Sequence, residues 1–439
     1  MNYKQLITKA REQGINPCEV NFENEEELNI SVFRHTVENF SISRQSQVRA
    51  RGVYNGKMGS ASTERLDAAA ADELLSKIRL GANCSEKEEL PEIFPGSEKY
   101  TKKNVFSKKI GSISVEEKKA LLLRLEQAAY DADPRVSDVQ AEYNENAGER
   151  VMLNSYGLSL KSKRNYCLFV VEVVCKDGEE IKSGWKFAVL DDPLQLDPTA
   201  LAEEAVRDTV SQFGGVSTAS GAYKCVLGPD VTGAFLAAAV NAGFNAENIQ
   251  KKSSVLAGKL GEKVFSPCVT IEEKPLKRCC FFRSFDDEGV ACRDKVLVDK
   301  GVVKTWLYNL ETARKDHTES TGNGYGSGKI GIRAVNLTLK SGRLSEEDLF
   351  GKAGNGVYIT SVTGLHAGLN PQSGDFSLEA SGYLIRDGKK ASPLGLFTCA
   401  GNLYTLFKDV RAVANNPRMQ PSGVTAGSVL VKSLKISCL

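Results

Sequence analysis

The hydrophobic and polar positions of the first half of the chain predict one order of elements that occurs twice. Apolar residues at helical spacing predict a helix over residues 3–13, which Gly14 ends. Asn55-Gly56 predicts a tight hairpin turn, because both central residues of such a turn need positive φ. A second helix is predicted over 66–79. Between the helices, alternation of apolar and polar residues predicts strands at 18–23, 27–34, 38–43, 48–54 and 57–62.

The same order returns after a lysine-rich connection over 86–109. Ser114 and Glu117 have the spacing of a capping box and predict the start of a helix that continues to Asp131. Another helix begins at Asp197-Pro198 and ends near residue 213. We interpret this half as an internal duplication whose charged residues alternate along a solvated sheet face. The strands predicted in the second copy are 136–143, 150–154, 158–162, 166–175 and 180–189.

Glycine and short strand-like segments dominate from residue 223 onward. Only two helices are predicted there, at 230–243 and after Ser345. The predicted fold is therefore α+β, with duplicated helix and antiparallel-sheet units over 1–108 and 109–218, and a mainly antiparallel sandwich or barrel over 219–439. The strands predicted in this last part are 225–227, 295–298, 302–308, 334–340, 356–362, 376–385 and 430–436.

The amino-acid composition limits the kinds of molecule that the protein is expected to bind. The 439 residues include 57 basic and 55 acidic side chains, for a net charge of +2. This balance gives no reason to expect direct nucleic-acid binding or an anionic membrane surface. No apolar leader follows Met1, and the longest nearly apolar run, 166–175, is far below the ~20 residues that a spanning helix needs. We therefore expect a cytoplasmic protein.

Cysteine and histidine are scattered rather than clustered. The eleven cysteines include no C-x-x-C pair, so we expect most of them to be reduced, partly buried thiols. The three histidines, His35, His317 and His366, lie in different segments. His317 and Glu319 have the H-x-E spacing of zinc deaminases, but the required P-C-x-x-C segment is missing after Cys268. No zinc motif is predicted.

Two further segments invite a chemical interpretation. The glycine-rich stretch 322–331 has Asn323 and Ile330 where a phosphate-binding loop needs Gly and Ser or Thr, and it lacks the strand-to-helix context of a dinucleotide site. It predicts a flexible surface loop. Asp286, Asp287 and Glu288 could hold a cation, but they lack the ligand spacing of a calcium loop. A solvated turn is favoured.

The densest polar cluster occupies residues 364–377 and contains His366, Asn370, Ser373 and Asp375. The residues alone favour a tight loop in which Asn and Asp bond nearby backbone groups. The alternative is a loop that presents His366 and Asp375 to a ligand or partner.

This loop, together with 378–388 and 398–403, resembles the C-terminal block of the TldD/PmbA family. Four shorter segments match the family in the same order, so that the resemblance spans essentially the whole chain: 256–264, 285–289, 299–301 and 321–323. The resemblance implies a cytosolic peptidase of two related subunits, once labelled modulators of DNA gyrase. Such enzymes trim or degrade unfolded peptides, including microcin precursors and an antitoxin.

In the TldD branch of the family, a helix carries His-Glu-x-x-x-His and a later cysteine completes a zinc site. Alignment on 258–262 places these three positions at Ala237, Ala238 and Ala242, and the expected cysteine region, 417–422, contains no Cys. A methyl group neither binds a metal nor accepts a proton. The chain thus resembles the metal-less TldE (PmbA) branch.

The resemblance to that branch implies no catalytic residue, cofactor or metal in this chain, and zinc in a TldD-like partner. Candidate contacts with substrate or partner are His366, Asn370, Ser373, Asp375 and Asn402.

Three functions remain as alternatives. The first is a non-catalytic subunit that supports substrate binding and assembly in a two-component metalloprotease acting on unfolded peptides. The second is an independent enzyme that uses His366, Asp375 or a cysteine in an unrecognised site. The third is a regulatory binding protein of the gyrase-modulator type. The missing ligands disfavour the second and the near-neutral charge disfavours DNA binding in the third, while a homodimer of the isolated chain is left open.

Overall fold

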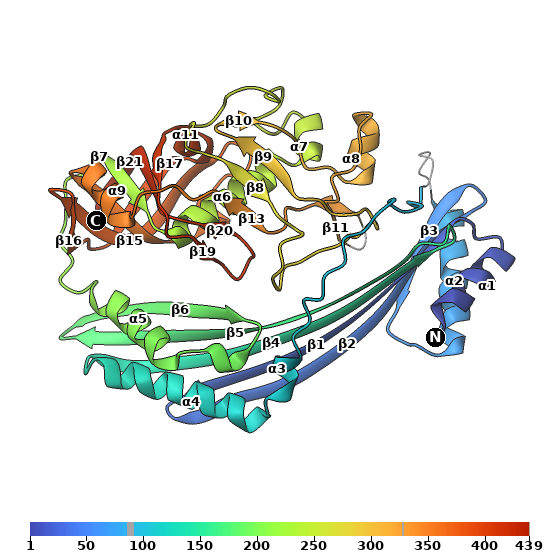
Figure 1. Cartoon of the computed structure of the whole chain (residues 1–439), viewed down its shortest axis with the longest axis horizontal. Coiled ribbons are helices and arrows are strands. Elements are labelled where there is room, and N and C mark those ends of the chain that lie inside the picture. Colours follow the sequence, from blue (N-terminus) through green and yellow to red (C-terminus); the bar gives the residue numbers. More distant parts are fainter. Residues whose placement is uncertain (86–91, 327–328, 439) are drawn as a thin grey trace.

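The computed structural model describes residues 1–85, 92–326 and 329–438 (Figure 1). In the first half, a helix, three strands and a second helix occur twice in that order. The first set is α1 (Tyr3–Glu12), β1 (Cys18–Phe33), β2 (Thr36–Tyr54), β3 (Lys57–Thr63) and α2 (Ala68–Cys84). The second set is α4 (Val115–Ala132), β4 (Val136–Asn154), β5 (Ser159–Asp177), β6 (Glu180–Leu190) and α5 (Pro198–Val210), with the short helices α3 (Lys108–Ser112) and η1 (Pro193–Gln195) beside it.

The two sets share one antiparallel sheet of order β3-β2-β1-β4-β5-β6, because β1 pairs with β4. The breaks predicted within β1, β2, β4 and β5 are wrong, since each strand runs unbroken through its polar middle. Opposite charges on neighbouring strands stabilise these stretches, as in the ion pairs of Arg49 with Glu23 and of Lys161 with Glu149. The alternation of apolar residues fades there, but the hydrogen-bonded ladder continues.

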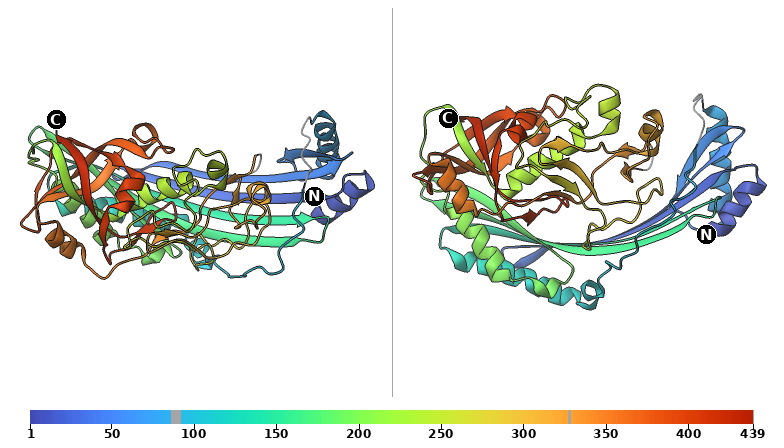
Figure 2. Two further views of the ribbon diagram at one scale, coloured as in Figure 1. Left: turned by 90° about the horizontal axis from the view of Figure 1, so that it is seen from above. Right: turned by 45° about the horizontal axis from the view of Figure 1, so that its top comes forward.

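Both helix pairs cover the convex face of this curved sheet, one pair at each end (Figure 1). Leu6 of α1 and Leu74 of α2 pack on Val20, whereas Leu122 of α4 and Ala202 of α5 belong to a separate core with Ile30. Val20 and Ile30 lie on the same face of β1, because side chains alternate along a strand. The second half of the chain lies over the opposite, concave face (Figure 2).

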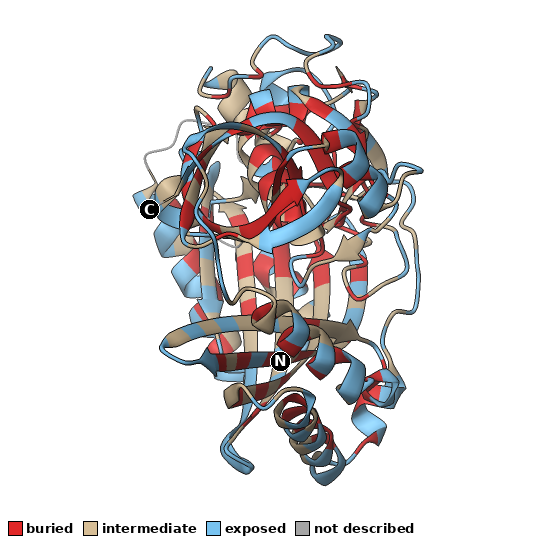
Figure 3. Ribbon diagram, turned by 90° about the vertical axis from the view of Figure 1, so that its left-hand side faces the viewer, coloured by how far each residue is buried: buried red, intermediate tan, exposed pale blue. Residues whose placement is uncertain are grey.

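The second half contains a closed ring of strands. β14 (Gly356–Thr363) pairs with both β7 (Gly221–Leu227) and β15 (Asp375–Arg386), and β21 (Val429–Cys438) and β17 (Phe397–Asn402) complete the circuit. Figure 3 looks onto this end of the molecule and shows the ring. The elements beside the ring are α9 (Glu346–Ala353), α10 (Leu365–Gly368), β16 (Lys389–Pro393), α11 (Leu403–Lys408) and β18 (Val410–Val413).

A second sheet, of order β10-β9-β8-β13-β20-β19, packs beside the ring, and helix α6 (Pro229–Gly243) contributes Phe235 and Leu236 to their common core. Its strands are β8 (Ile271–Glu273), β9 (Lys295–Asp299), β10 (Val302–Val303), β13 (Leu337–Leu339), β19 (Arg418–Met419) and β20 (Thr425–Ala426). Short elements near it are α7 (Ala246–Gln250), α8 (Leu310–Lys315), β11 (Gly324–Tyr325) and β12 (Gly331–Ile332).

The predicted α+β class, with its mainly antiparallel second half, is confirmed, but two strands were predicted too long. The strand predicted at 302–308 ends at Val303, because Leu307 instead donates its backbone N–H to Phe244. The strand predicted at 334–340 covers only Leu337–Leu339. Trp306 and Leu307 are buried in the core, and this explains why the segment is apolar although it forms no strand.

All eleven cysteines are free thiols, and burial raises the pKa of Cys167 to about 12, as expected for thiols that act as small apolar residues. Across the described ranges, no helix combines the length and apolar character that a bilayer span requires.

A charged cleft as the candidate functional site

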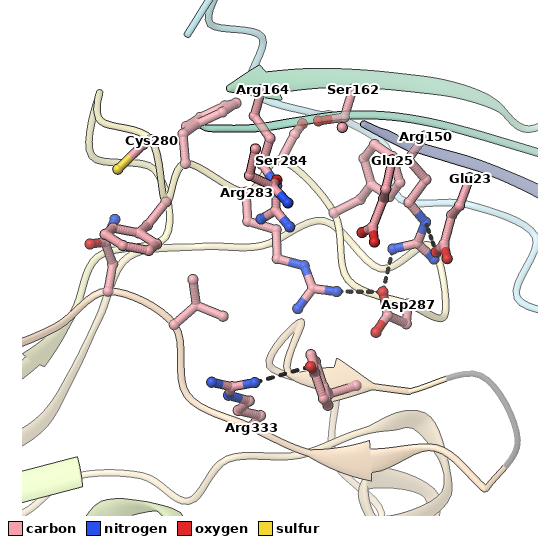
Figure 4. A pocket seen from close by; sticks show the side chains of 18 of the residues that line it. Glu23, Glu25, Arg150, Ser162, Arg164, Cys280, Arg283, Ser284, Asp287 and Arg333 are labelled. Atoms are coloured by element: carbon pink, nitrogen blue, oxygen red, sulfur yellow. Dashed lines mark hydrogen bonds and ion pairs between the residues drawn. The ribbon is translucent and has the colours of Figure 1, made fainter. Parts of the chain in front are cut away.

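A cleft between the concave face of the sheet and the loops of the second half widens into two cavities. Their volumes are about 580 Å³ and about 860 Å³. Glu23, Arg49, Arg150, Asp287 and Gly326 line both cavities and therefore stand between them. Figure 4 shows the smaller cavity, which we call the arginine cavity after Arg150, Arg164, Arg283 and Arg333 in its wall. Volumes of this size suit a small ligand or a short peptide.

The sheet contributes paired charges to the cleft. Residues directly opposite in an antiparallel ladder share a face, so Glu19 meets Arg51 and Glu23 meets Arg150. Arg51 Nε lies 3.1 Å from a carboxylate oxygen of Glu19, and Glu19 is only 2% exposed. We predicted a solvated face here, which is wrong for this stretch. The second half of the chain covers it, and each of these four charges has a partner in place of water.

The acidic turn at 286–289 forms the opposite wall, and the solvated turn predicted there is also wrong. The carboxylate of Asp286 is fully buried and accepts hydrogen bonds from the backbone N–H groups of Glu288 (2.9 Å), Val290 (2.9 Å) and Gly324 (2.8 Å). These three backbone N–H groups replace the water that the carboxylate loses on burial. The local sequence does not predict this, because one of the donors, Gly324, lies far along the chain.

Two buried carboxyl groups share this turn. Glu288 is 5% exposed and accepts a hydrogen bond of 2.8 Å from the N–H of Leu310, where α8 begins. Burial raises the pKa of Asp286 to about 6, against the effect of its backbone donors. Burial, together with the negative charge of Asp286, raises the pKa of Glu288 to about 8. At neutral pH the turn therefore holds a protonated Glu288.

Asp287 joins the turn to the sheet. Its carboxylate forms ion pairs with Arg150 of β4 and with Arg283, and it accepts a hydrogen bond of 2.7 Å from the N–H of Gly326. Burial by itself would raise the pKa of Asp287, but the two guanidinium groups outweigh burial and hold its pKa below the usual range. On the far side, Tyr100 Oη donates 2.7 Å to the carbonyl oxygen of Gly289. The turn is thus held between the sheet and the connection that joins α2 to α3.

The glycine-rich segment is not the loose surface loop that we predicted, as far as residues 322–326 and 329–331 describe it; residues 327–328 lie outside the described residues. Asn323 is 1% exposed, and its amide donates 2.6 Å to Glu273 and 3.0 Å to the carbonyl oxygen of Arg333. Lys295 pairs with the same Glu273. Buried polar side chains fix this segment, because each of them needs a partner.

Arg333 and Tyr325 form an exposed pair at the mouth of the arginine cavity. Arg333 Nη1 donates 3.0 Å to Tyr325 Oη, and the guanidinium lies 4.9 Å from the centre of the Tyr325 ring. The guanidinium of Arg283 lies 5.9 Å from the same ring. Contact between a cation and an aromatic face holds an arginine in a defined direction.

Helix α6 reaches this region from the second half. Ala237 and Ala238 are partly buried against the core, while Asn241 Oδ1 accepts a hydrogen bond of 3.3 Å from the N–H of Ala334 in the cavity wall. The segment 417–422 also packs on α6, because Gln420 donates 2.8 Å to the carbonyl oxygen of Asp230.

These positions do not fit a zinc ion, since alanine side chains and an amide offer none of the usual donor set. Within the part of the chain that the structure describes, no three His, Cys, Asp or Glu side chains are placed to hold a metal.

The structure brings together four of the five residues predicted as substrate or partner contacts. Asn402 donates 2.8 Å to the carbonyl oxygen of Ser373 and 2.9 Å to Asp375 Oδ1, while Asn370 Oδ1 accepts from the N–H of Ser373 (3.1 Å). The bond from Asn402 lowers the pKa of Asp375.

His366 lies apart on α10 and is exposed. An open hollow of about 660 Å³ adjoins Asn370 and Asp375. Their role as contacts stays a prediction.

Sequence reasoning missed the cleft residues themselves. Glu23, Arg150, Asp287 and Arg333 come from four distant segments, and each looks like an ordinary surface charge in its local context. One signal was available: residues 285–289 were among the segments that carry the family resemblance, although their acidic side chains were interpreted as a turn.

Comparison with known proteins identifies the class. Three family models match in chain order: PmbA/TldA metallopeptidase domain 1 over residues 18–80, the central domain over 108–213 and the C-terminal domain over 220–438. The chain therefore belongs to the PmbA/TldD metallopeptidase family.

Individual relatives agree with this assignment. The chain is 28% identical over 332 residues to the metalloprotease PmbA homolog of Haemophilus influenzae, which covers 74% of this chain and 70% of the relative. The solved structure of TM0727 from Thermotoga maritima, described as a candidate modulator of a DNA gyrase, matches with a TM-score of 0.92 and 28% identity over 99% of both chains. The structure of TldE from Thermococcus kodakarensis shares the fold, with a TM-score of 0.90 and 23% identity over 99% of both chains.

Proposed function

We propose that this chain is the metal-less, TldE-like subunit of a cytoplasmic two-component metalloprotease that degrades or processes unfolded peptides. In this proposal, a TldD-like partner supplies zinc and the catalytic groups. This chain supports assembly and supplies part of the peptide-binding surface. By itself it binds no metal and catalyses no reaction.

The observation that carries the proposal is the chemistry of α6. Asn241 of the helix contacts Ala334 in the wall of a peptide-sized cleft, yet Ala237, Ala238 and Ala242 occupy the positions where the family resemblance places zinc ligands and the general base. Zinc hydrolysis needs nitrogen, sulfur or oxygen ligands and an open coordination position. A cleft that keeps its charged walls without those ligands suits binding rather than bond cleavage.

The test combines activity, metal content and assembly. Hydrolysis of an unfolded peptide and protein-bound zinc are measured for this chain alone, for a TldD-like subunit alone and for the mixture, and light scattering gives the mass of each sample. We expect activity, zinc and a heteromeric mass only when the partner is present. The same light-scattering measurement on the isolated chain decides between monomer and homodimer.

The other outcomes identify the alternatives. Chelator-sensitive activity with stoichiometric zinc in the isolated chain would contradict the proposal and indicate an independent enzyme. Failure to associate with the partner, together with binding to gyrase, would support the regulatory alternative.

A further inference from the structure

The arginine cavity contains basic side chains that the protein itself does not neutralise. Most of the charges in its wall are satisfied internally. Asp287 pairs with Arg150 and Arg283, and Glu23 pairs with Arg49 and with Arg150 (3.4 Å).

Arg164 and Arg333 differ from these residues. Among the described residues, neither has a carboxylate within ion-pair distance, although both line the cavity. Glu25 is an unpaired acid of the same wall, but it lies beside Glu23, away from Arg333 (Figure 4). In the sheet register, Glu25 and Arg164 flank Gly148 in one row across the strands, so Arg164 has an acid nearby without forming an ion pair with it. The wall around Arg333 is therefore the part of the cavity that carries a positive charge without an ion-pair partner.

Arg333 is oriented before any ligand arrives. One of its N–H groups is used by Tyr325 Oη at 3.0 Å, and the guanidinium lies 4.9 Å from the centre of the Tyr325 ring, so that two contacts to one side chain hold the arginine in place. An arginine has five N–H donors, and most of those of Arg333 have no acceptor in the described part of the protein. A planar fork of donors with a fixed direction matches a carboxylate, which accepts two parallel hydrogen bonds.

Aromatic side chains lie in the same wall. Tyr166 of β5 and Phe281 both line the cavity, and their ring centres are 6.1 Å apart. Such rings offer an apolar surface for a side chain next to a carboxylate. A cavity of about 580 Å³ holds a few residues of an extended peptide.

We propose that the arginine cavity binds a carboxylate of a peptide, with Arg333 as the principal anchor, Arg164 as a second cation on the opposite wall, and Tyr166 and Phe281 against the neighbouring apolar side chain. The carboxylate is either the C-terminus of the peptide or an acidic side chain. The inference rests on the proposed function, because it names the substrate group that the cleft of this subunit holds.

Calorimetric titration of the full, isolated chain with unlabelled peptides tests the proposal. Three hexapeptides are compared: one that ends in phenylalanine with a free C-terminus and has no acidic side chain, its C-terminal amide, and the same amide with one internal glutamate. Wild-type protein is expected to bind at least one carboxylate-bearing peptide 10-fold or more tightly than the neutral amide, because hydrogen bonds to a charged group are stronger than those to a neutral one. Preference for the first peptide identifies the C-terminus as the source, and preference for the third identifies an acidic side chain.

Substitution assigns the site. Arg333→Gln is expected to weaken the preferred peptide about 10- to 100-fold and to leave the neutral amide unchanged, because the change removes only the ion pair. Arg164→Gln is expected to weaken the same peptide by a smaller factor. Arg343→Gln, an exposed arginine outside the cavity, serves as the matched control and is expected to bind like wild type.

Equal binding of all three peptides, no binding of any of them at millimolar concentration, or wild-type binding by Arg333→Gln would each overturn the proposal. These outcomes are distinct from failure of the proposed function, which is decided by the activity and zinc of the mixture with the partner. An active mixture whose isolated subunit ignores carboxylates would remove only the present inference.

Discussion

Glu288 is a carboxyl group that the fold keeps protonated. Only 5% of the residue is exposed, and the neighbouring Asp286 adds a negative charge. Its pKa rises from 4.5 to about 8, and that of Asp286 from 3.8 to about 6. A raised pKa means that the folded state holds the proton more tightly than the unfolded state does. The stabilisation by Glu288 is therefore fully present below about pH 4.5 and is lost as the pH rises through about 8.

This linkage predicts the behaviour of Glu288→Gln, which mimics the protonated side chain and does not titrate. Between pH 5 and pH 8, the wild type should lose about 2–4 kcal/mol of unfolding free energy that the variant retains. Urea unfolding at both pH values measures the difference. Glu116→Gln, at an exposed position, is the control and should track the wild type. A difference between Glu288→Gln and wild type that does not change with pH would contradict the assigned protonation state.

At the residue scale, the sequence predicted side-chain and turn interactions only where the partners lie close together in the chain. The capping box of Ser114 with Glu117 and the turn at Asn55-Gly56 are present as predicted, because their partners lie within a few residues. Asp286 shows the opposite case. One of its three backbone donors is on Gly324, far along the chain, so that a buried carboxylate was interpreted as a solvated turn.

The packing of helix α2 on strand β3 depends on one glycine. A Cβ atom on Gly59 would lie 1.9 Å from the carbonyl oxygen of Ile78 and 2.8 Å from the N of Ala82, both on the helix backbone. Backbone atoms in a helix cannot move aside as a flexible side chain does, so the two elements would have to separate. Gly148, on β4, differs because a Cβ there meets nothing within 4 Å.

Gly59→Ala should therefore lower the free energy of unfolding by about 2–3 kcal/mol, since overpacking forces α2 away from the sheet. Gly148→Ala, the matched strand glycine, should change it by no more than about 0.5 kcal/mol. Urea titrations followed by circular dichroism measure both values. Equal effects of the two substitutions would show that the close approach at Gly59 has no energetic weight.

The sequence predicted most of the longer helices and strands, but it did not predict how long the strands are. Helices with clear caps and apolar spacing, such as α1, α4 and α5, match their predictions closely. The long strands were divided at their polar centres, because the alternation of apolar residues stops between the two helix pairs that cover the sheet ends. Short helices such as α8 and α11 were missed, since a single turn leaves little periodic signal.

The two halves of the molecule meet through buried charges and through an apolar cluster in which Met152, Leu158 and Leu160 pack on Phe285, and the candidate site exists only because they meet. Arg150 belongs to the sheet and Asp287 to the second half, with side chains that are 16% and 13% exposed. The two residues are separated by more than a hundred positions in the sequence, so that neither composition nor local pattern could indicate their contact. The family resemblance indicated the class of protein, but the cleft and its arginines required the assembled fold.

The whole-molecule arrangement leads to a prediction for Asp287→Asn. Asparagine keeps the shape of the side chain, but it leaves Arg283 without a counter-charge and Arg150 with Glu23 alone, in a largely buried place. Breaking a buried pair typically costs about 3–5 kcal/mol, and the partial exposure of these groups reduces the expected loss of unfolding free energy to about 2–3 kcal/mol. Tryptophan fluorescence, which comes from Trp306 in the buried core of the second half and from the exposed Trp185 of the sheet, and circular dichroism follow the same urea titration. Glu319→Gln, the control, removes an exposed partner of Arg293 and should change the free energy of unfolding by less than about 0.5 kcal/mol.

If Asp287→Asn were as mild as Glu319→Gln, apolar contacts rather than the Arg150–Asp287 pair would hold the halves together. The charges of the cleft would then contribute to ligand binding and not to stability.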